Sequence, residues 1–479
     1  MRQTLRRSCD ACAKSKHSCD LRTPRCSRCI KRQVRCLYAN EPLTAPPIAP
    51  KKIESSSLPS PPELAGVAYP LVSHRLGSVD PFESYPQTRL PRERVQRLIH
   101  SFLNKIAFQY YPLDLNASSN PFLVSWWPLA LGDPALFHVS LQTACLDEEL
   151  LAQKGFQASE ILMADSVALL RRKVEDESQA LQDGTMNSVI TLAAIEFGKG
   201  NIKVAEMHVA GVKRLADLRG GINAVRQTSP LTARMVSWVS MLILGYPQFN
   251  TQDDLGTGLG IPPTPEWQLD LATLYDEPSI IDGLDVDYDV ANVFLRLRAV
   301  FQRAATIPLS TTRLHDLTCF VIHRLLPSKS DLGNSGHSPL TEAIRYAVIL
   351  YMFIIHGPTY YSHAVILDAI TTRFMNNFQQ LDIILAGHES LAVWFTAIGL
   401  VASSDTAHYV WFQQRAGVVA ASLGVEAWQD LFIHTRSVLW LEMTRGEYTF
   451  SPHWDAILGR GSLSPALSSL SGDRAMFWK

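Results

Sequence analysis

The spacing of the cysteines is the feature of this sequence that most directly implies chemistry. Six of the eight cysteines lie between Cys9 and Cys36, in the stretch "CDACAKSKHSCDLRTPRCSRCIKRQVRC". The spacing, C-x2-C-x6-C-x6-C-x2-C-x6-C, is two copies of a three-cysteine unit joined by a six-residue loop. Zinc prefers four ligands in a tetrahedron. Six cysteines therefore satisfy two zinc ions only if two sulfurs bridge both metals, and a duplicated unit fits that arrangement.

The same segment is strongly basic. Residues 1–36 hold eleven Lys and Arg but only two acids, a net charge of +9, which leaves −10 for the rest because the whole chain carries −1. Such asymmetry indicates a basic module for a polyanion attached to a near-neutral body. The segment has few apolar residues, so metal binding is expected to supply its folding energy.

Two other interpretations of the cysteine segment are open. The first is a disulfide knot, and the second is a zinc clip without a nucleic-acid role. No apolar segment follows the basic N-terminus, and the longest apolar run, Tyr346 to Ile355, is too short to cross a bilayer. We therefore expect a soluble intracellular protein in a reducing compartment, which disfavours the disulfide knot.

The chain divides into regions of different composition. We predict a mainly α protein with a small N-terminal metal module (1–40), a disordered linker (41–90), a large all-α region (91–450) and a C-terminal tail (451–479). Residues 41–90 hold ten of the 28 prolines and seven serines, which cannot build a core. Between Arg234 and Arg296 there are ten acids and no Lys or Arg, which indicates a long, exposed and mobile acidic loop.

Helical periodicity dominates from about Arg92 onward. Asp133 and Pro134 are the expected N-cap and first residue of one helix. In another, Val204, His208, Gly211, Leu215 and Leu218 share a predicted apolar face, and Gly220 is the predicted terminator. Further helices are predicted near residues 230–245, 290–306, 311–326, 340–356, 361–378, 389–402, 405–421 and 424–444.

The cysteine segment resembles the fungal Zn(II)2Cys6 binuclear zinc cluster, the DNA-binding domain of fungal transcription factors. Pro24 matches the proline of the family's loop. The resemblance implies two zinc ions held by six cysteines, of which the first and fourth bridge. These are Cys9 and Cys26. Cys12 and Cys19 would complete one zinc site, and the other would be completed by Cys29 and Cys36.

The resemblance also implies how DNA is read. A helix after the second cysteine enters the major groove and recognises a CGG-type triplet, and here that helix is "AKSKHS", where Lys16 occupies the base-reading position. Ala13, Ser15 and Ser18 depart from commonly basic positions, and Lys14 adds charge. The remaining predicted DNA contacts, which we interpret as phosphate contacts, are Arg22, Arg25, Arg28, Lys31 and Arg32.

A weaker resemblance covers the helical body. "NPFLVSWWPLALGDPALFHVSLQTA" and "HVAGVKRLADLRGG" resemble the fungal-specific transcription factor domain, which implies a regulatory role with a coactivator or a small-molecule effector as partner. Together the resemblances predict a nuclear, sequence-specific regulator of RNA polymerase II genes. The alternatives are a zinc-stapled protein-interaction module and an enzyme in the helical body, but the sequence contains no recognisable catalytic motif.

The oligomeric state is a separate question. Proline after Cys36 forbids a continuous helix, and the amphipathic stretch from Val95 to Ile106 is too short for a coiled coil. We therefore expect the zinc module alone to be monomeric and any dimer to form through the helical body.

Overall fold

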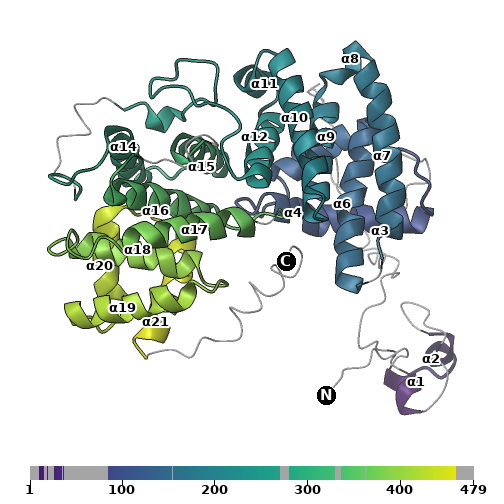
Figure 1. Ribbon diagram of the computed structural model, residues 1–479. Helices are drawn as coiled ribbons and strands as arrows, with labels where there is room; N and C mark the ends of the chain where they lie inside the picture. The colour runs from purple at the N-terminus through teal and green to yellow at the C-terminus, as the bar shows by residue number, and fades with distance from the viewer. Residues whose placement is uncertain are drawn as a thin grey trace, which may run out of the picture. The chain divides into compact units, whose positions relative to one another are not determined.

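The computed structural model in Figure 1 describes most of the chain. It describes residues 10–15, 19, 26–34, 36, 85–153, 155–269, 280–328, 336–361 and 363–459. The chain separates into two compact units, Met1–Ser78 and Val79–Lys479. Most of the predicted linker, residues 41–84, and the end of the predicted tail, residues 460–479, lie outside the described residues.

The prediction of a mainly α protein is confirmed, since 69% of the structure is helix. The described residues contain no β-strand, and only Thr251 and Ile261 form an isolated β-bridge. The smaller unit holds two short helices, α1 (Asp10–Lys14) and α2 (Ser27–Lys31). The larger unit begins with α3 (Arg92–Ser101), the π-helix η1 (Phe102–Ile106), α4 (Ala107–Tyr110), the π-helix η2 (Phe122–Trp126), α5 (Trp127–Gly132), α6 (Pro134–Ala152), α7 (Gln157–Glu175), α8 (Glu177–Ala180), α9 (Asp183–Gly198), α10 (Ile202–Leu218), α11 (Ile222–Thr228) and α12 (Pro230–Leu244).

The second part of the larger unit continues in the same way. A 3-10 helix, η3 (Pro265–Trp267), precedes α14 (Tyr288–Ala304), α15 (Thr311–Leu325), α16 (Pro339–His356), α17 (Ala364–Phe378), α18 (Glu389–Ala402), α19 (Tyr409–Leu423), α20 (Trp428–Val438) and α21 (Thr444–Ile457). Most predicted helices are present within a few residues. The predicted helix 424–444 is shorter, because the backbone turns extended after Val438. The helical region also runs past residue 450, to Ile457.

Helix α6 shows how local sequence sets a helix start. The carboxylate of Asp133 accepts hydrogen bonds from the backbone N–H groups of Ala135 (3.0 Å) and Leu136 (3.2 Å), and Pro134 is the first helical residue. An N-cap side chain of this kind satisfies donors that have no partner inside the helix. The predicted N-cap is therefore confirmed, and Asp133 also forms an ion pair with Lys173 of α7.

Helix α9 lies at the centre of the first part of the larger unit. It packs against α6, α7, α10 and α12, which surround it in Figure 1. Residues 184–196 of α9 are all buried. A helix enclosed by other helices buries side chains on every side, and here they include polar ones such as Asn187 and Thr191.

The predicted apolar face of α10 is wrong. The buried residues are Ala205, Val209, Val212 and Ala216, which face α9, whereas Val204 and Leu218 are exposed. Two alanines on the buried face let the two helix backbones approach closely, so small residues mark the contact. The predicted terminator is in place: Gly220 has φ +92°, in the left-handed region that favours glycine.

Helix α16 is the longest of the strongly apolar helices in the second part. It contacts α14, α15, α17 and α18. By length and composition it is the one single helix among the described residues that could cross a membrane, and the bent pair α19 and α20 could do so together. However, 83% of the α16 window is buried within the protein, which is typical of a core helix.

A tyrosine cluster joins the two parts of the larger unit. The hydroxyl of Tyr361 donates to the hydroxyl of Tyr110 at 2.7 Å, and the backbone N–H of Tyr360 donates to the carbonyl of Gln109 at 2.7 Å. The ring of Tyr110 stacks on Phe122 with centroids 4.8 Å apart. Residues that are about 250 positions apart in sequence therefore share one core.

The prediction of a long, exposed and mobile acidic loop is wrong for part of that stretch. Asp254 accepts hydrogen bonds from Trp267 (2.9 Å) and Asn292 (2.7 Å), and it pairs with Arg296 (3.3 Å) and Arg324 (3.5 Å). These contacts hold the loop against α14 and α15. Acids nearer its end, Asp282, Asp285 and Asp289, are exposed as predicted, and residues 270–279 lie outside the described residues.

Candidate metal centre and nucleic-acid interface

The two short helices of the smaller unit carry the predicted metal ligands. Cys12 lies in α1, Cys29 lies in α2, and Cys26 is the N-cap of α2 with an extended backbone. The sulfur of Cys26 accepts a hydrogen bond from the backbone N–H of Cys29 at 3.4 Å. A backbone donor at a helix start favours a negatively charged sulfur, the form that binds metals.

Three sulfurs come together in this unit. The ligand atoms of Cys12, Cys26 and Cys29 all lie within 4.8 Å of one another, and all three side chains are buried. The sulfurs of Cys12 and Cys26 are 3.7 Å apart. Two thiolates on one tetrahedral zinc, each at about 2.3 Å, would be about 3.8 Å apart. The separation of the Cys12 and Cys26 sulfurs therefore fits two ligands of one zinc ion.

The other predicted ligands lie around this group or outside the described residues. The sulfur of Cys36 accepts a hydrogen bond from the backbone N–H of Cys26 at 3.4 Å. Cys19 is half-buried and packs against the buried cysteines. Cys9 lies outside the described residues. Cys26 is thus close to Cys12, which belongs to the first three-cysteine repeat of the sequence. It is also close to Cys29 and Cys36, the other two cysteines of its own repeat.

Basic side chains lie at the ends of both helices. Lys14 is exposed in the last turn of α1, Lys31 and Arg32 are exposed at the end of α2, and Arg28 is half-buried. Gln33 follows with φ +50°, a left-handed residue that turns the chain away from α2. The other predicted DNA contacts, Lys16, Arg22 and Arg25, lie outside the described residues.

Comparison with known families agrees with this geometry. Residues 7–45 match the model of the Fungal Zn(2)-Cys(6) binuclear cluster domain, and residues 97–244 match that of the Fungal specific transcription factor domain. The chain carries both of these domains. It matches no curated protein and no solved structure.

The two domains together make the chain a zinc-binding, DNA-binding transcription regulator. Both families are transcription-factor domains, and neither is an enzyme family. The zinc-cluster domain coincides with the buried cysteines and the basic helix ends. The fungal transcription factor domain, as matched, covers the helices that surround α9 and ends with α12.

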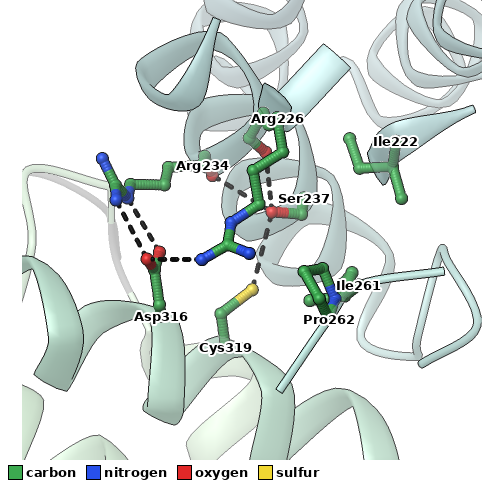
Figure 2. Close-up of a pocket in the computed structure, with 9 residues that line it drawn as sticks. Ile222, Arg226, Arg234, Ser237, Ile261, Pro262, Asp316 and Cys319 are labelled. Atoms are coloured by element: carbon green, nitrogen blue, oxygen red, sulfur yellow. Dashed lines mark hydrogen bonds and ion pairs between the residues drawn. The ribbon is translucent and has the colours of Figure 1, made fainter. Parts of the chain in front are cut away.

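A buried ionic cluster lies at the edge of the fungal transcription factor domain (Figure 2). Asp316 of α15 pairs with Arg226 of α11 at 3.0 Å and with Arg234 of α12 at 2.8 Å. Burial acts to raise the pKa of Asp316, but hydrogen bonds and charge from Arg234, with a smaller effect of Arg226, lower it below its usual value. The cavity beside these residues has a volume of about 20 Å³, room for one water molecule.

This cluster is a structural tie between α11, α12 and α15. Cys319 lines the same cavity, and burial raises the pKa of its thiol to about 12, so it stays protonated and unreactive. Cys319 and Cys145 are both buried, so both are core thiols. Sequence reasoning missed the ionic cluster, since Arg234 and Asp316 are 82 residues apart.

Histidines form a second buried polar group nearby. The Nδ1 of His356 is 3.1 Å from the carbonyl of Gly357, so it must donate there, which leaves its Nε2 to accept from the Nδ1 of His315 at 2.9 Å. The ring of His356 also stacks on Trp238, with centroids 4.5 Å apart. His356 is therefore neutral, because one of its ring nitrogens donates and the other accepts. His315 is kept neutral mainly by burial, which lowers its pKa.

These buried histidines predict a loss of stability in mild acid. Burial lowers the pKa of His315 and His363 to about 3, with a further contribution from His356, and burial lowers the pKa of His323 to about 4. Unfolded histidine titrates near about 6.5. Below that pH the unfolded chain binds more protons, so the free energy of unfolding should fall as the pH drops from 6.5 towards 4.

Urea unfolding between pH 7.5 and 4.5 tests this, with tryptophan fluorescence as the signal. All ten tryptophans lie in the larger unit, so the signal reports on it alone. His323→Leu should flatten the pH dependence, whereas His100→Ala, at an exposed position, should leave it unchanged. Equal slopes in all three proteins would contradict the assignment.

Proposed function

We propose that the zinc-cluster domain holds two zinc ions through Cys9, Cys12, Cys19, Cys26, Cys29 and Cys36, with Cys9 and Cys26 bridging. The position of Cys26 supports this proposal. Its sulfur lies 3.7 Å from that of Cys12, and its backbone N–H contacts the sulfur of Cys36. A bridging sulfur needs ligands of both zinc sites close to it. The zinc ions would fold this domain, because it has almost no apolar core of its own.

The domain would use this fold to bind duplex DNA and read a CGG-type triplet. The observation that carries the proposal is that the buried cysteines tie together two helices with exposed basic residues at their ends. Lys16 would read guanine in the major groove, since a lysine donates to O6 and N7. The phosphate contacts, which position the domain without reading sequence, would be Lys14, Arg22, Arg25, Arg28, Lys31 and Arg32.

The whole chain would act in the nucleus on RNA polymerase II genes. The division proposed here is a DNA-binding module at 1–40, a linker at 41–90, a regulatory helical domain at 91–450 and a tail at 451–479. The fungal transcription factor domain would receive a coactivator or a small-molecule effector. Genome-wide mapping of bound sites would test the CGG preference, and an absence of enriched CGG triplets would overturn it.

A pair of variants separates base reading from phosphate contact. Lys16→Ala should lower affinity for a CGG-containing duplex by about 1–3 kcal/mol while changing affinity for random DNA little. Arg32→Ala should weaken binding to both duplexes about equally. It should also reduce the slope of the logarithm of the binding constant against the logarithm of salt concentration by about one unit. Fluorescence anisotropy at several salt concentrations measures both effects. Equal losses on both duplexes for Lys16→Ala would make Lys16 a phosphate contact.

A protein-interaction module without a specific DNA target is the second candidate. It is favoured by two exposed apolar side chains on the small domain, Ile30 (57% exposed) and Val34 (40% exposed). In that case, affinity for CGG-containing and scrambled duplexes would be the same at every salt concentration. Ile30→Ser should leave DNA binding unchanged if the first proposal holds.

A further inference from the structure

Helix α10 carries two apolar faces, but only one of them is covered. Ala205, Val209, Val212 and Ala216 are buried against α9. On the opposite side, Met207 is 63% exposed and Leu218 is 64% exposed. A methionine and a leucine that keep most of their surface in water on the same helix face indicate a contact surface.

Four exposed charges lie on or beside this face and follow a pattern. Their order along α10 is Lys203, Glu206, Arg214 and Asp217, that is, plus, minus, plus, minus. Each is exposed, and within the part of the chain that the structure describes none of the four forms an ion pair. The two inner charges are equally far from Ala210 in sequence, and so are the two outer ones. Residues at equal distances on either side of Ala210 therefore carry opposite charges.

We propose that the exposed face of α10 pairs with the same face of a second copy of this chain. The two helices would run antiparallel around a two-fold axis at Ala210. Lys203 would then lie opposite Asp217 of the second copy, and Glu206 would lie opposite Arg214 of the second copy. A two-fold interface repeats each contact, so four opposite-charge pairs form. A parallel pair in register would instead place each charge beside its own copy.

The centre of the face suits close contact between helices. Ala210 and Gly211 are both exposed and small, so the two backbones could approach at the axis. A Cβ added at Gly211 would meet nothing within 4 Å in the monomer, so no packing inside the chain requires this glycine. Met207 would cover the centre from both sides, and Val204 and Leu218 would extend the apolar contact.

The exposed face of α10 is small, and this limits the expected affinity of the dimer. A stable interface buries about 800 Å² on each partner, and a single helix face offers less. The dimer should therefore dissociate at micromolar concentrations, and DNA with two binding sites should favour it by holding two copies together. The inference concerns the helical region alone and stands whether or not the zinc-cluster domain reads a CGG triplet.

Sedimentation velocity of the full chain over a range of concentrations tests the proposal by charge exchange. Glu206→Arg alone would place like charges opposite each other twice, and so would Arg214→Glu alone. Each should raise the dissociation constant about tenfold or more. The double variant E206R/R214E restores opposite charges and should recover the dimer. Recovery would not be expected if the single variants acted by unfolding the chain.

A matched control and a crosslink complete the test. Arg171→Glu reverses an exposed charge on α7 and should leave the dimer unchanged. Ala210→Cys places a thiol on the proposed axis and should form an intermolecular disulfide under mild oxidation, whereas Arg171→Cys should not. A monomer at all concentrations, or a dimer that survives both single variants, would overturn the proposal.

Discussion

A Cys26→Ser variant is expected to lose both zinc ions of the two that the wild-type chain is proposed to bind. Cys26 caps α2, and its sulfur is close to that of Cys12 and accepts from the N–H of Cys29. If this sulfur bridges the metals, its removal leaves both sites one ligand short. The apparent free energy of structural zinc binding is about 10–16 kcal/mol at pH 7, and in such domains it is also the folding energy. No other substitution considered for this protein should have so large an effect.

Zinc content measured by mass spectrometry, together with DNA affinity, would follow this variant. Cys36→Ser removes a ligand that belongs to one zinc in the proposed arrangement, so it should retain more zinc than Cys26→Ser. Cys145→Ser, deep in the larger unit, should keep two zinc ions and normal DNA binding. If Cys26→Ser and Cys36→Ser lost the same single ion, the bridging role of Cys26 would be wrong.

The two units were not equally predictable from sequence. The duplicated cysteine spacing predicts which sulfur atoms lie close together, because zinc accepts few coordination geometries. The structure brings the sulfurs of Cys12, Cys26 and Cys29 within 4.8 Å of one another, and those of Cys12 and Cys26 are 3.7 Å apart. The local signals of helix ends worked for the same reason: a cap such as Asp133 acts on neighbours in sequence.

Contacts between distant segments were not predictable in this way. Periodicity correctly identified α10 as amphipathic but selected the wrong face, because both faces carry apolar residues and only the position of α9 decides between them. For Asp254 the sequence indicates an exposed loop, because no Lys or Arg lies near it in sequence. Its partners, Arg296 and Arg324, come from α14 and α15.

The ionic cluster of Asp316 gives the second large expected effect. Asp316→Ala should lower the free energy of unfolding of the larger unit by about 3–5 kcal/mol, the cost of leaving buried charges without their partner. Arg226 and Arg234 would remain, with side chains 25% and 19% exposed, so we expect a value near the lower end. Because the pKa of Asp316 is lowered in the folded state, its contribution is present above the unfolded pKa of about 4 and is lost as the pH falls further.

Urea unfolding followed by tryptophan fluorescence at pH 7 measures the effect of Asp316→Ala on the larger unit. Asp382→Ala is the matched control, since its carboxylate pairs with Arg415 but is 64% exposed, and an exposed pair contributes about 0–1 kcal/mol. Removing all three charges together, with Arg226→Met, Arg234→Met and Asp316→Leu, should recover much of the loss, because the penalty comes from unpaired charge and not from lost attraction. If the triple variant were no more stable than Asp316→Ala, the cluster would act through its exact shape around Ser237 and Cys319 and not through the balance of its charges.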